Sequence, residues 1–255
     1  MQFDEFSKSL EGFYSLSELK SLFQFLKKEE PILWQDAVNR LAAFEPLDYI
    51  IGYTPFYKNN FKVTKDTLIP RPETEELVDW ILDEQKSDNL ISILDIGTGS
   101  GCIAISLALH LKNSGVTAVD ISKEALEVAK SNASKLNATV NFVNIDFLDI
   151  NHWNQIGNFD IVVSNPPYIP EKERTQMEAN VLMHEPKISL FVPDLNPLIF
   201  YENIFEFAQN HLKPNGVIYC ETSQNIQLLE YNGFQIDPKI DLSGNPRFIK
   251  GVKIN

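Results

Sequence analysis

Apolar residues recur at helical spacing in the first fifty positions of the chain. Ser15 and Glu18 form a capping box, so we expect the first long helix to begin directly after Ser15. Pro31 suits the first turn of a second helix. The two apolar stripes are Leu16, Leu19, Leu22, Phe23 and Leu26, and then Leu33, Trp34, Ala37, Val38, Leu41 and Ala42. Such helices must bury their stripes against one another, which fits a structural bundle and a substrate-docking domain equally well.

Residues 51–69 change to short aromatic runs on either side of a polar turn. Phe56 and Tyr57 precede the turn, and Phe61-Lys62-Val63 follow it. Because Asn tolerates positive φ, we expect a β-hairpin with the turn Lys58-Asn59-Asn60. This hairpin would link the helical unit to the rest of the chain.

Arg71 stands between two prolines at the start of another predicted helix. Pro72 suits the first helical position, and Glu73 and Glu75 favour the positive end of the helix dipole. The pattern is typical of a helix entry. It leaves open whether Arg71 contacts a ligand or only braces a loop, and the same question applies to His184.

From residue 91 onward, short apolar runs alternate with longer amphipathic segments. This alternation predicts an α/β fold with a doubly wound parallel sheet, because parallel strands need helical crossovers. We expect strands at 91–96, 116–121, 140–145, 159–163 and 216–221, and helices at 102–111, 123–133 and 198–211. Residues 232–255 predict a terminal antiparallel hairpin around Ser243-Gly244-Asn245-Pro246. The chain therefore divides into a helical domain (1–52), a hairpin linker (53–69) and an α/β domain (70–255).

Composition and charge narrow the classes of partner. The chain has 255 residues and a net charge of −13, with 22 basic and 35 acidic residues. This balance disfavours steering toward nucleic acid and favours a protein partner with a basic face. No window approaches the ~18 apolar residues of a membrane span, and the N-terminus lacks a signal-peptide layout, so we expect a cytoplasmic protein without membrane contact. The spacing of Cys102 and Cys220 suggests neither a metal site nor a disulfide, and we expect both thiols to be buried.

A glycine-rich turn ends the first strand of the α/β domain. Gly97, Gly99 and Gly101 give the spacing G-x-G-x-G, whereas a dinucleotide-binding turn needs G-x-G-x-x-G, and position 102 is Cys. The spacing favours S-adenosylmethionine, which has no phosphate. We expect the whole turn to border this cofactor, including Thr98 and Ser100, and Asp95 to accept from its ammonium group.

Acidic and aromatic residues follow the next two predicted strands. The carboxyl ends of parallel strands meet at one edge, where open α/β sheets bind ligands. Asp120 is placed to hold ribose hydroxyls, and Asp146 and Phe147 to border adenine by hydrogen bonding and stacking. Each acid also suits a helix or turn cap. The coincidence at successive strand ends is what favours a cofactor site.

Asn165-Pro166-Pro167-Tyr168 ends the fourth strand at this same edge. The prolines cannot donate to the sheet, so a stiff loop must leave it here. The Asn165 side-chain oxygen and the Pro166 carbonyl are suited to accept the two N–H bonds of a planar NH₂ group, with Tyr168 stacked on it. Catalysis would then consist of positioning for in-line methyl transfer and stabilising the positive charge that develops on nitrogen.

These residues resemble the class I S-adenosylmethionine-dependent N-methyltransferases. The resemblance rests on Asp95 to Gly101, Asp120 and Asn165 to Tyr168. Residues 46–52, 61–63, 68–74 and 184–187 narrow it to the peptide chain release factor glutamine methyltransferases. The similarity covers essentially the whole chain and is weakest over residues 1–45.

The resemblance implies a Rossmann-like domain preceded by a helical substrate-docking domain and a hairpin. It implies N5-methylation of the glutamine in the Gly-Gly-Gln loop of release factors. Gly97 to Gly101, Asp120 and Phe147 would line the cofactor, with Asn165 beside it, and Asn165 to Tyr168 would hold the glutamine. Many members have Trp where this chain has Phe147.

Three other functions remain open at this point. An adenine-N6 methyltransferase would use the same clamp, on RNA rather than DNA, since no stretch is large or basic enough to be a DNA-recognition domain. A cofactor-binding scaffold would need neither Asn165 nor Tyr168. A nicotinamide oxidoreductase is disfavoured by the glycine spacing.

Overall fold

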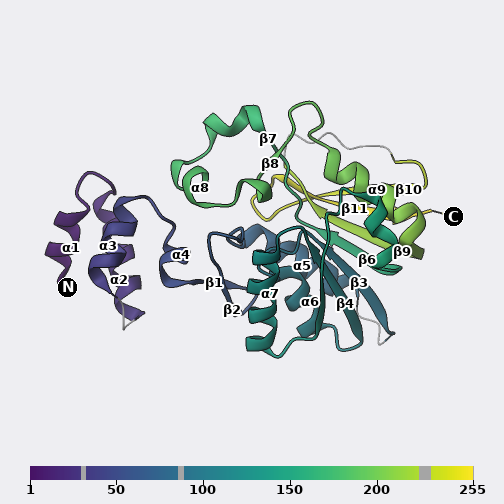
Figure 1. The fold of residues 1–255 in the computed structure, drawn as a ribbon, viewed down its shortest axis with the longest axis horizontal. Helices are drawn as coiled ribbons and strands as arrows, with labels where there is room; N and C mark the ends of the chain where they lie inside the picture. The colour runs from purple at the N-terminus through teal and green to yellow at the C-terminus, as the bar shows by residue number, and fades with distance from the viewer. Residues whose placement is uncertain (30–32, 86–88, 224–230, 255) are drawn as a thin grey trace.

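Four short helices form the N-terminal part of the computed structural model, which describes residues 1–29, 33–85, 89–223 and 231–254. They are α1 (Phe3–Ser9), α2 (Leu16–Lys28), α3 (Trp34–Ala42) and α4 (Leu47–Ile51). The predicted capping box is present, because the Ser15 hydroxyl accepts from Glu18 N and the Glu18 carboxylate accepts from Ser15 N. Pro31 lies outside the described residues. Figure 1 shows this unit at one end of the molecule.

The helical unit encloses a small core of its own. Phe6, Leu10, Leu26, Ala37 and Leu41 are almost fully buried in it, together with Leu19 and Val38. Leu16 and Leu33 were expected on the buried stripes, but they are 58% and 80% exposed. Leu16 is the first residue of α2 and Leu33 the cap that precedes α3, so neither lies under a neighbouring helix.

The hairpin consists of β1 (Tyr53–Phe56) and β2 (Asn59–Lys62). Its turn is shifted from the predicted position, because Tyr57 and Lys58 carry the positive φ angles of 43° and 66°, while Asn59 begins the second strand. The hairpin and the place of Lys58 in its turn are therefore confirmed, whereas the expectation that Asn59 and Asn60 form the turn is wrong. The Tyr57 hydroxyl donates to Asp79 Oδ1 at 2.6 Å and its ring packs edge-on against His110, and these contacts offset the backbone strain.

A seven-stranded sheet forms the centre of the larger domain, as predicted. The strand order is β10-β11-β9-β6-β3-β4-β5, parallel from β9 to β5 and antiparallel at β10 and β11. The strands are β3 (Ile91–Ile96), β4 (Ser114–Asp120), β5 (Val140–Asn144), β6 (Phe159–Ser164), β9 (Leu212–Glu221), β10 (Phe234–Ile240) and β11 (Pro246–Lys253). All the strands predicted for this domain are confirmed.

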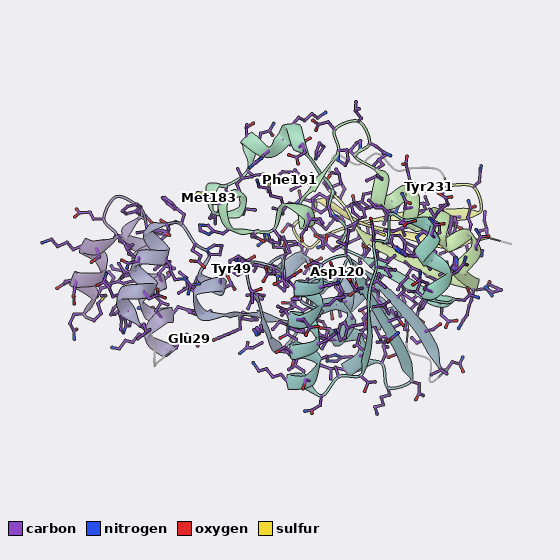
Figure 2. The ribbon with its side chains drawn as sticks, viewed as in Figure 1. Glu29, Tyr49, Asp120, Met183, Phe191 and Tyr231 are labelled. Atoms are coloured by element: carbon purple, nitrogen blue, oxygen red, sulfur yellow. The ribbon has the colours of Figure 1, made fainter. Side chains whose placement is uncertain are left out.

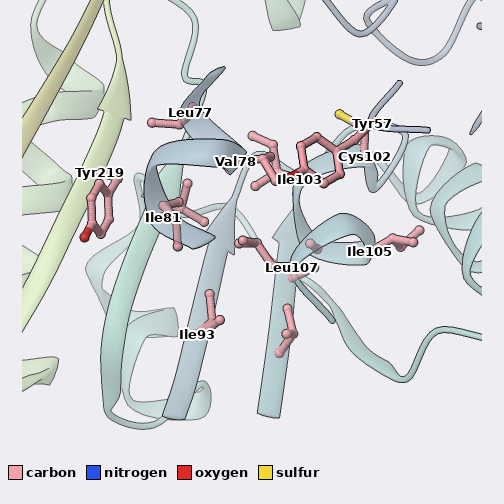
Figure 3. Close-up of a cluster of buried hydrophobic side chains, with 14 of the residues drawn as sticks. Tyr57, Leu77, Val78, Ile81, Ile93, Cys102, Ile103, Ile105, Leu107 and Tyr219 are labelled. Atoms are coloured by element: carbon pink, nitrogen blue, oxygen red, sulfur yellow. The ribbon is translucent and has the colours of Figure 1, made fainter. Parts of the chain in front are cut away.

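Helices cover both faces of the sheet, so the doubly wound prediction is confirmed. They are α5 (Pro72–Glu84), α6 (Cys102–His110), α7 (Lys123–Leu136) and α9 (Ile199–His211). On one face, Leu77 and Ile81 of α5 pack with Ile103 of α6 and Ile93 of β3 (Figure 3). On the other face, α9 packs against a short 3₁₀ helix, η1 (Ile150–Gln155). Both cysteines are buried and unpaired, as expected.

A segment without predicted structure extends from the sheet between β6 and α9. We call residues 169–192 the arm. Its ends pair as two short parallel strands, β7 (Ile169–Pro170) and β8 (Phe191–Val192). Between them lie η2 (Glu171–Gln176), α8 (Ala179–His184) and η3 (Lys187–Ser189). The arm lies over one end of the sheet and reaches toward the N-terminal helices (Figure 1).

Two contacts anchor the arm and identify structural partners for Arg71 and His184. The Arg71 guanidinium pairs with the buried carboxylate of Glu185 at 2.6 Å, and the other Glu185 oxygen accepts from Ile69 N. His184 Nε2 lies 2.8 Å from the carbonyl oxygen of Ala43 in the helical unit. The arm therefore connects the two parts of the chain on the side of the sheet where its parallel strands end.

Over the described ranges, no helix combines the length and the apolar character needed to cross a bilayer. Nor do the residues with defined positions include a cluster of three or more His, Cys, Asp or Glu side chains suited to a metal ion.

Asn132 of α7 joins the hairpin to the glycine turn. Its amide nitrogen donates to the carbonyls of Lys62 and Ser100, and its oxygen accepts from Lys62 N, all within 3.0 Å. Asn132→Leu would leave the buried Ser100 carbonyl unsatisfied, together with the partly buried N–H and carbonyl groups of Lys62, at about 1–3 kcal/mol for each fully buried group. We expect a loss of about 3 kcal/mol or more in the free energy of unfolding, measured with urea. The exposed Asn39→Leu should cost less than about 0.5 kcal/mol, and equal losses would contradict the role of Asn132.

Candidate active site

The predicted site residues meet at the edge where the parallel strands end. Register pairing sets Ile96 of β3 beside Ser164 of β6, and Asp120 of β4 beside Asn144 of β5. The Ser164 hydroxyl also donates to the Ile96 carbonyl at 2.7 Å. The loops that follow these strands therefore emerge next to one another, although up to about seventy residues of chain separate them.

Backbone N–H groups of the glycine turn donate to other groups of the protein. The amides of Gly97 and Thr98 both donate to the Val119 carbonyl, and Gly101 N donates to Thr98 O. Gly99 N donates to the Asp120 carboxylate at 2.8 Å. Phosphate-binding turns instead point such amides at the ligand. The contacts of this turn thus agree with a cofactor that lacks phosphate.

A cavity of about 190 Å³ lies between the turn and the neighbouring strand ends, and we call it the strand-end cavity. Among the predicted site residues, its lining includes Gly97, Gly99, Asp120, Asp146, Phe147, Asn165 and Pro167. The described lining contains no Lys or Arg side chain, but it does contain two carboxylates, Asp120 and Asp146. Such a lining repels a pyrophosphate and favours a cation with apolar and aromatic parts. Figure 2 labels Asp120, which lies near the centre of the molecule.

The other residues of the turn support it from below. The Thr98 hydroxyl donates to Asp95 Oδ2 at 2.6 Å, so its side chain faces the sheet. Ser100 is buried, and a side chain at Gly101 would meet Ile105 and Ala129. The structure thus brings two of the five predicted turn residues to the cavity lining and places the remaining three behind it.

Phe147 is held firmly at the far wall of the strand-end cavity. Its ring contacts Trp153 and Phe207, with centroids 5.7 and 5.4 Å away, and its carbonyl accepts from Trp153 Nε1. Asp146 Oδ1 accepts from Leu148 N at 2.9 Å. These contacts position both residues before any ligand arrives.

Sequence reasoning missed several residues of the lining. Leu68 comes from the segment before α5, Ile188 and Ser189 come from the arm, and Phe200 comes from α9. Leu68 lies in the stretch 68–74 that carries the family resemblance, and Phe200 lies in the predicted helix 198–211, but neither signal places these side chains at the site. The long-range folding of the chain brings all four residues to the cavity.

A second cavity of about 220 Å³ lies between the Asn-Pro-Pro-Tyr loop and the arm, and we call it the arm cavity. Its lining consists of Leu68, Arg71, Asn165, Pro166, Tyr168, Ile169, Met177, Val181, Ser189 and Leu190. Leu68, Asn165 and Ser189 line both cavities. Asn165 therefore stands at the junction, where groups held in the two cavities would meet.

Hydrogen bonds fix the side chain of Asn165. Its Nδ2 donates to the Thr74 hydroxyl at 3.1 Å, and that hydroxyl donates to Glu221 Oε2 at 2.6 Å. The Asn165 oxygen is left as the atom that can accept from a bound group. Neither Thr74 nor Glu221 was identified from the sequence.

Burial raises the pKa of three groups around the site. It raises the pKa of Asp95 to about 7, although Thr98 and Ala104 N donate to one of its oxygens. The other oxygen, Oδ1, is buried without a partner among the described residues, and Asp95 is not part of the cavity lining. Burial also raises the pKa of Asp120, and it raises the pKa of Tyr168, which stays a neutral phenol near pH 7.

Known methyltransferases are similar to this chain in sequence and in fold. Residues 87–236 match the family model described as a methyltransferase domain. A release factor glutamine methyltransferase of Flavobacterium psychrophilum is 41% identical over 97% of this chain and 93% of its own. One from Bacteroides thetaiotaomicron is 45% identical over 84% and 78% of the two chains. The putative methyltransferase yhhF from Escherichia coli shares the fold alone, with a TM-score of 0.53 and 17% identity over 77% of this chain and 92% of that chain.

Gly99 provides a test of the strand-end cavity. Its φ of 54° disfavours any side chain, and a Cβ there would meet open space within the cavity lining. We expect Gly99→Ala to weaken S-adenosylmethionine binding at least about tenfold by calorimetry, because left-handed strain of about 1–2 kcal/mol would displace the turn. Gly157→Ala has the same kind of strain, at φ 90°, and lies before the opposite end of β6. Equal weakening in both variants would show that the effect is not local.

Asp95 predicts a particular pH dependence of stability. Its pKa rises from 3.8 in the unfolded chain to about 7 in the folded one, so its contribution to stability is lost as pH rises through this range. Asp95→Asn lacks the charge. Relative to the parent, the variant should gain about 3 kcal/mol of unfolding free energy between about pH 5 and pH 8, measured with urea.

A matched control for Asp95 is Asp160→Asn. The Lys213 ammonium and Ser92 lower the pKa of Asp160, so this group is ionised in both states over the same interval. Its substitution should have the same effect at both pH values. A constant effect of Asp95→Asn would show that Asp95 does not titrate in this range.

Proposed function

The chain belongs to the release factor glutamine methyltransferase family, and we propose that it methylates the side-chain amide nitrogen of the glutamine in the Gly-Gly-Gln loop of peptide chain release factors. The methyl donor is S-adenosylmethionine. The observation that carries the proposal is the position of Asn165 at the junction of the two cavities, where its amide nitrogen is bound to Thr74 and its amide oxygen has no partner among the described residues. We propose the cytoplasm as its place of action, where translation terminates.

The strand-end cavity has the chemistry to hold S-adenosylmethionine. When bound, this cofactor supplies an electrophilic methyl group on a cationic sulfur. Asp120 and Asp146 give the cavity a negative charge that favours its sulfonium and ammonium groups. In this proposal Asp120 holds the ribose hydroxyls, and Asp146 and Phe147 border the adenine. Gly97 and Gly99 allow close approach of the backbone, while Thr98, Ser100 and Gly101 support the turn.

Asn165 and Pro166 would hold the substrate amide in the arm cavity. The Asn165 oxygen accepts one N–H bond and the Pro166 carbonyl accepts the other, so the nitrogen lone pair turns toward the strand-end cavity. Tyr168 and Pro167 enclose the planar group. Held in this way, the amide nitrogen would form its new N–C bond as the sulfur–carbon bond of the donor breaks, and it would then lose a proton to solvent.

The arm cavity suits a reaction that needs no general base. Its described lining includes Arg71, Tyr168 and Ser189 but no carboxylate, His or Lys. Tyr168 is a neutral phenol near pH 7, and burial raises its pKa further. Acceptors that orient the amide, rather than a base that removes its proton first, are what this cavity offers.

The helical unit is proposed to dock the release factor. It has its own hydrophobic core, which agrees with a domain at 1–52, a linker at 53–69 and a methyltransferase domain at 70–255. His184 of the arm contacts Ala43 of this unit, so the docking surface would be continuous with the wall of the arm cavity. The net charge of −13 favours a basic protein surface over a nucleic acid, and we expect no direct nucleic-acid binding.

Methyl transfer to purified substrates tests this function. With labelled S-adenosylmethionine, we expect label on a release factor and none on tRNA, rRNA or DNA. A Gln→Asn change in its Gly-Gly-Gln loop should abolish labelling, because the shorter side chain cannot reach the junction. Label on RNA alone would instead identify an adenine-N6 methyltransferase.

Asn165→Ala tests the role of the junction residue. Loss of a positioned acceptor should lower kcat by about 10²–10³-fold. The affinity for S-adenosylmethionine, measured by calorimetry, should change less than about threefold, because the remaining lining is intact. An equal loss of both would mean that Asn165 mainly builds the strand-end cavity.

A further inference from the structure

Three side chains from distant parts of the sequence form one buried chain of hydrogen bonds. Asn165 follows β6, Thr74 lies in the first turn of α5, and Glu221 ends β9. Thr74 and Glu221 are each only 2% exposed. The links are Asn165 Nδ2 to Thr74 Oγ1 at 3.1 Å and Thr74 Oγ1 to Glu221 Oε2 at 2.6 Å. The chain begins at the reaction junction and ends on a carboxylate outside both cavity linings.

The carboxylate dictates the direction of every hydrogen bond in this chain. An ionised carboxylate can only accept, and a hydroxyl has one proton to donate. Thr74 must therefore give its proton to Glu221 and accept from Asn165. Asn165 must turn its NH₂ group toward Thr74, which leaves its carbonyl oxygen facing the substrate.

Protonation of Glu221 would remove this constraint. A neutral carboxyl group can donate to Thr74, which frees the Thr74 proton to point at Asn165. The Asn165 carboxamide can then turn over and accept that proton with its oxygen. Its NH₂ group would face the NH₂ group of the substrate, and two donors cannot bind one another.

We propose that Glu221 is a positioning residue that orients the Asn165 carboxamide through Thr74, and that methyl transfer requires Glu221 to be ionised. The proposal rests on the function proposed above. In this proposal the charge of Glu221 determines whether the oxygen or the NH₂ group of Asn165 faces the substrate. Thr74 links the two residues, because its hydroxyl is hydrogen-bonded to both.

The surroundings of Glu221 place its ionisation within the working range of an enzyme. Burial is the largest influence and raises the pKa of Glu221 to about 7, and the charge of Glu73 also raises it. Arg247 of β11 and Arg71 lower it, as does the hydrogen bond from Thr74. Arg247 is itself bound to Asp241 at 3.2 Å, and Arg71 to Glu185.

Neutral groups complete these surroundings. The Tyr201 hydroxyl donates to the Glu221 backbone carbonyl at 3.0 Å, which fixes the end of β9. Burial raises the pKa values of Tyr168, Tyr201 and Cys102, so these groups stay uncharged near pH 7. Two described carboxyl groups therefore change charge near pH 7 in this part of the site, Glu221 and Asp95 behind the glycine turn, and of these only Glu221 is hydrogen-bonded to Thr74.

The experiment measures kcat and KM for release-factor methylation between about pH 5.5 and pH 9 at saturating S-adenosylmethionine. In the parent enzyme, kcat should fall about tenfold per pH unit below an apparent pKa near 7. Glu221→Gln and Thr74→Val should lower kcat at pH 8 at least about tenfold and lose this acid limb. Thr74→Ser keeps the hydroxyl and should keep both the rate and the limb.

Two results would overturn the proposal. One is a Glu221→Gln enzyme that retains the parent acid limb, and the other is one that retains the parent kcat at pH 8. Calorimetric affinity for S-adenosylmethionine should stay within about threefold of the parent in all three variants. That control shows whether each variant folds, and Thr74→Val gives a second route if Glu221→Gln does not.

An NMR titration separates this proposal from the proposed function. The side-chain NH₂ signals of Asn165, assigned by their loss in Asn165→Ala, should shift with an apparent pKa near 7 in the protein without substrate. The shift should be absent in Glu221→Gln. A titrating Asn165 with no labelled release factor would contradict the function alone. Labelled release factor with a non-titrating Asn165 would contradict the role of Glu221 alone.

Discussion

The parallel register of β3 and β6 is the constraint on which the site depends. Pairing of Ile96 with Ser164, reinforced by the Ser164 hydroxyl on the Ile96 carbonyl, sets the glycine turn beside the Asn-Pro-Pro-Tyr loop. A slip of one residue would turn every side chain of the strand to the opposite face. It would also separate Asn165 from the strand-end cavity. The hydrophobic cores on both faces of the sheet hold this register, so packing far from the chemistry determines its geometry.

Polar groups near this edge are paired in ways that leave selected atoms available. The backbone amides of Gly97 and Thr98 donate to the Val119 carbonyl, and that of Gly99 donates to the Asp120 carboxylate. These three amides of the turn are therefore not free to bind an anion. Arg71 is paired with Glu185, although its side chain also lines the arm cavity. The result is a cofactor cavity with negative charge and an arm cavity with acceptors. A cationic methyl donor and an amide with two N–H bonds match these two environments.

The strands of the sheet were predicted well from the sequence because the signal for each strand lies within a few neighbouring residues. The strands β3, β4 and β6 are short runs rich in apolar residues that end at or just before Gly97, Asp120 and Pro166, and the bounds of β3 agree with the expected 91–96. The predicted hairpin turn, Lys58-Asn59-Asn60, begins one residue later than the observed one, because tertiary contacts of Tyr57 outweigh the preference of Asn for positive φ. The arm had no periodic signal, since its short elements are held by Glu185 and by the β7–β8 pair rather than by an amphipathic stripe. Residues that motifs mark, such as Asp120 and Asn165, were found, whereas Thr74 and Glu221 were not, because 147 positions separate them.

The distance between Glu221 and the junction explains how an acid can assist a reaction that needs no base. A carboxylate inside the arm cavity would compete for the N–H bonds of the substrate and would attract the cationic donor away from its own cavity. Behind Thr74, the same charge acts only through the direction of two hydrogen bonds. Its energetic cost is the desolvation that raises its pKa, and its benefit is an Asn165 oxygen that faces the amide whenever Glu221 is ionised. Asn carries both a donor and an acceptor at nearly equal positions, so an active site that relies on Asn must also contain a group that decides between them. In this fold that group is Glu221 at the end of β9, the strand next to β6. The register of β6 and β9 fixes its position relative to Asn165.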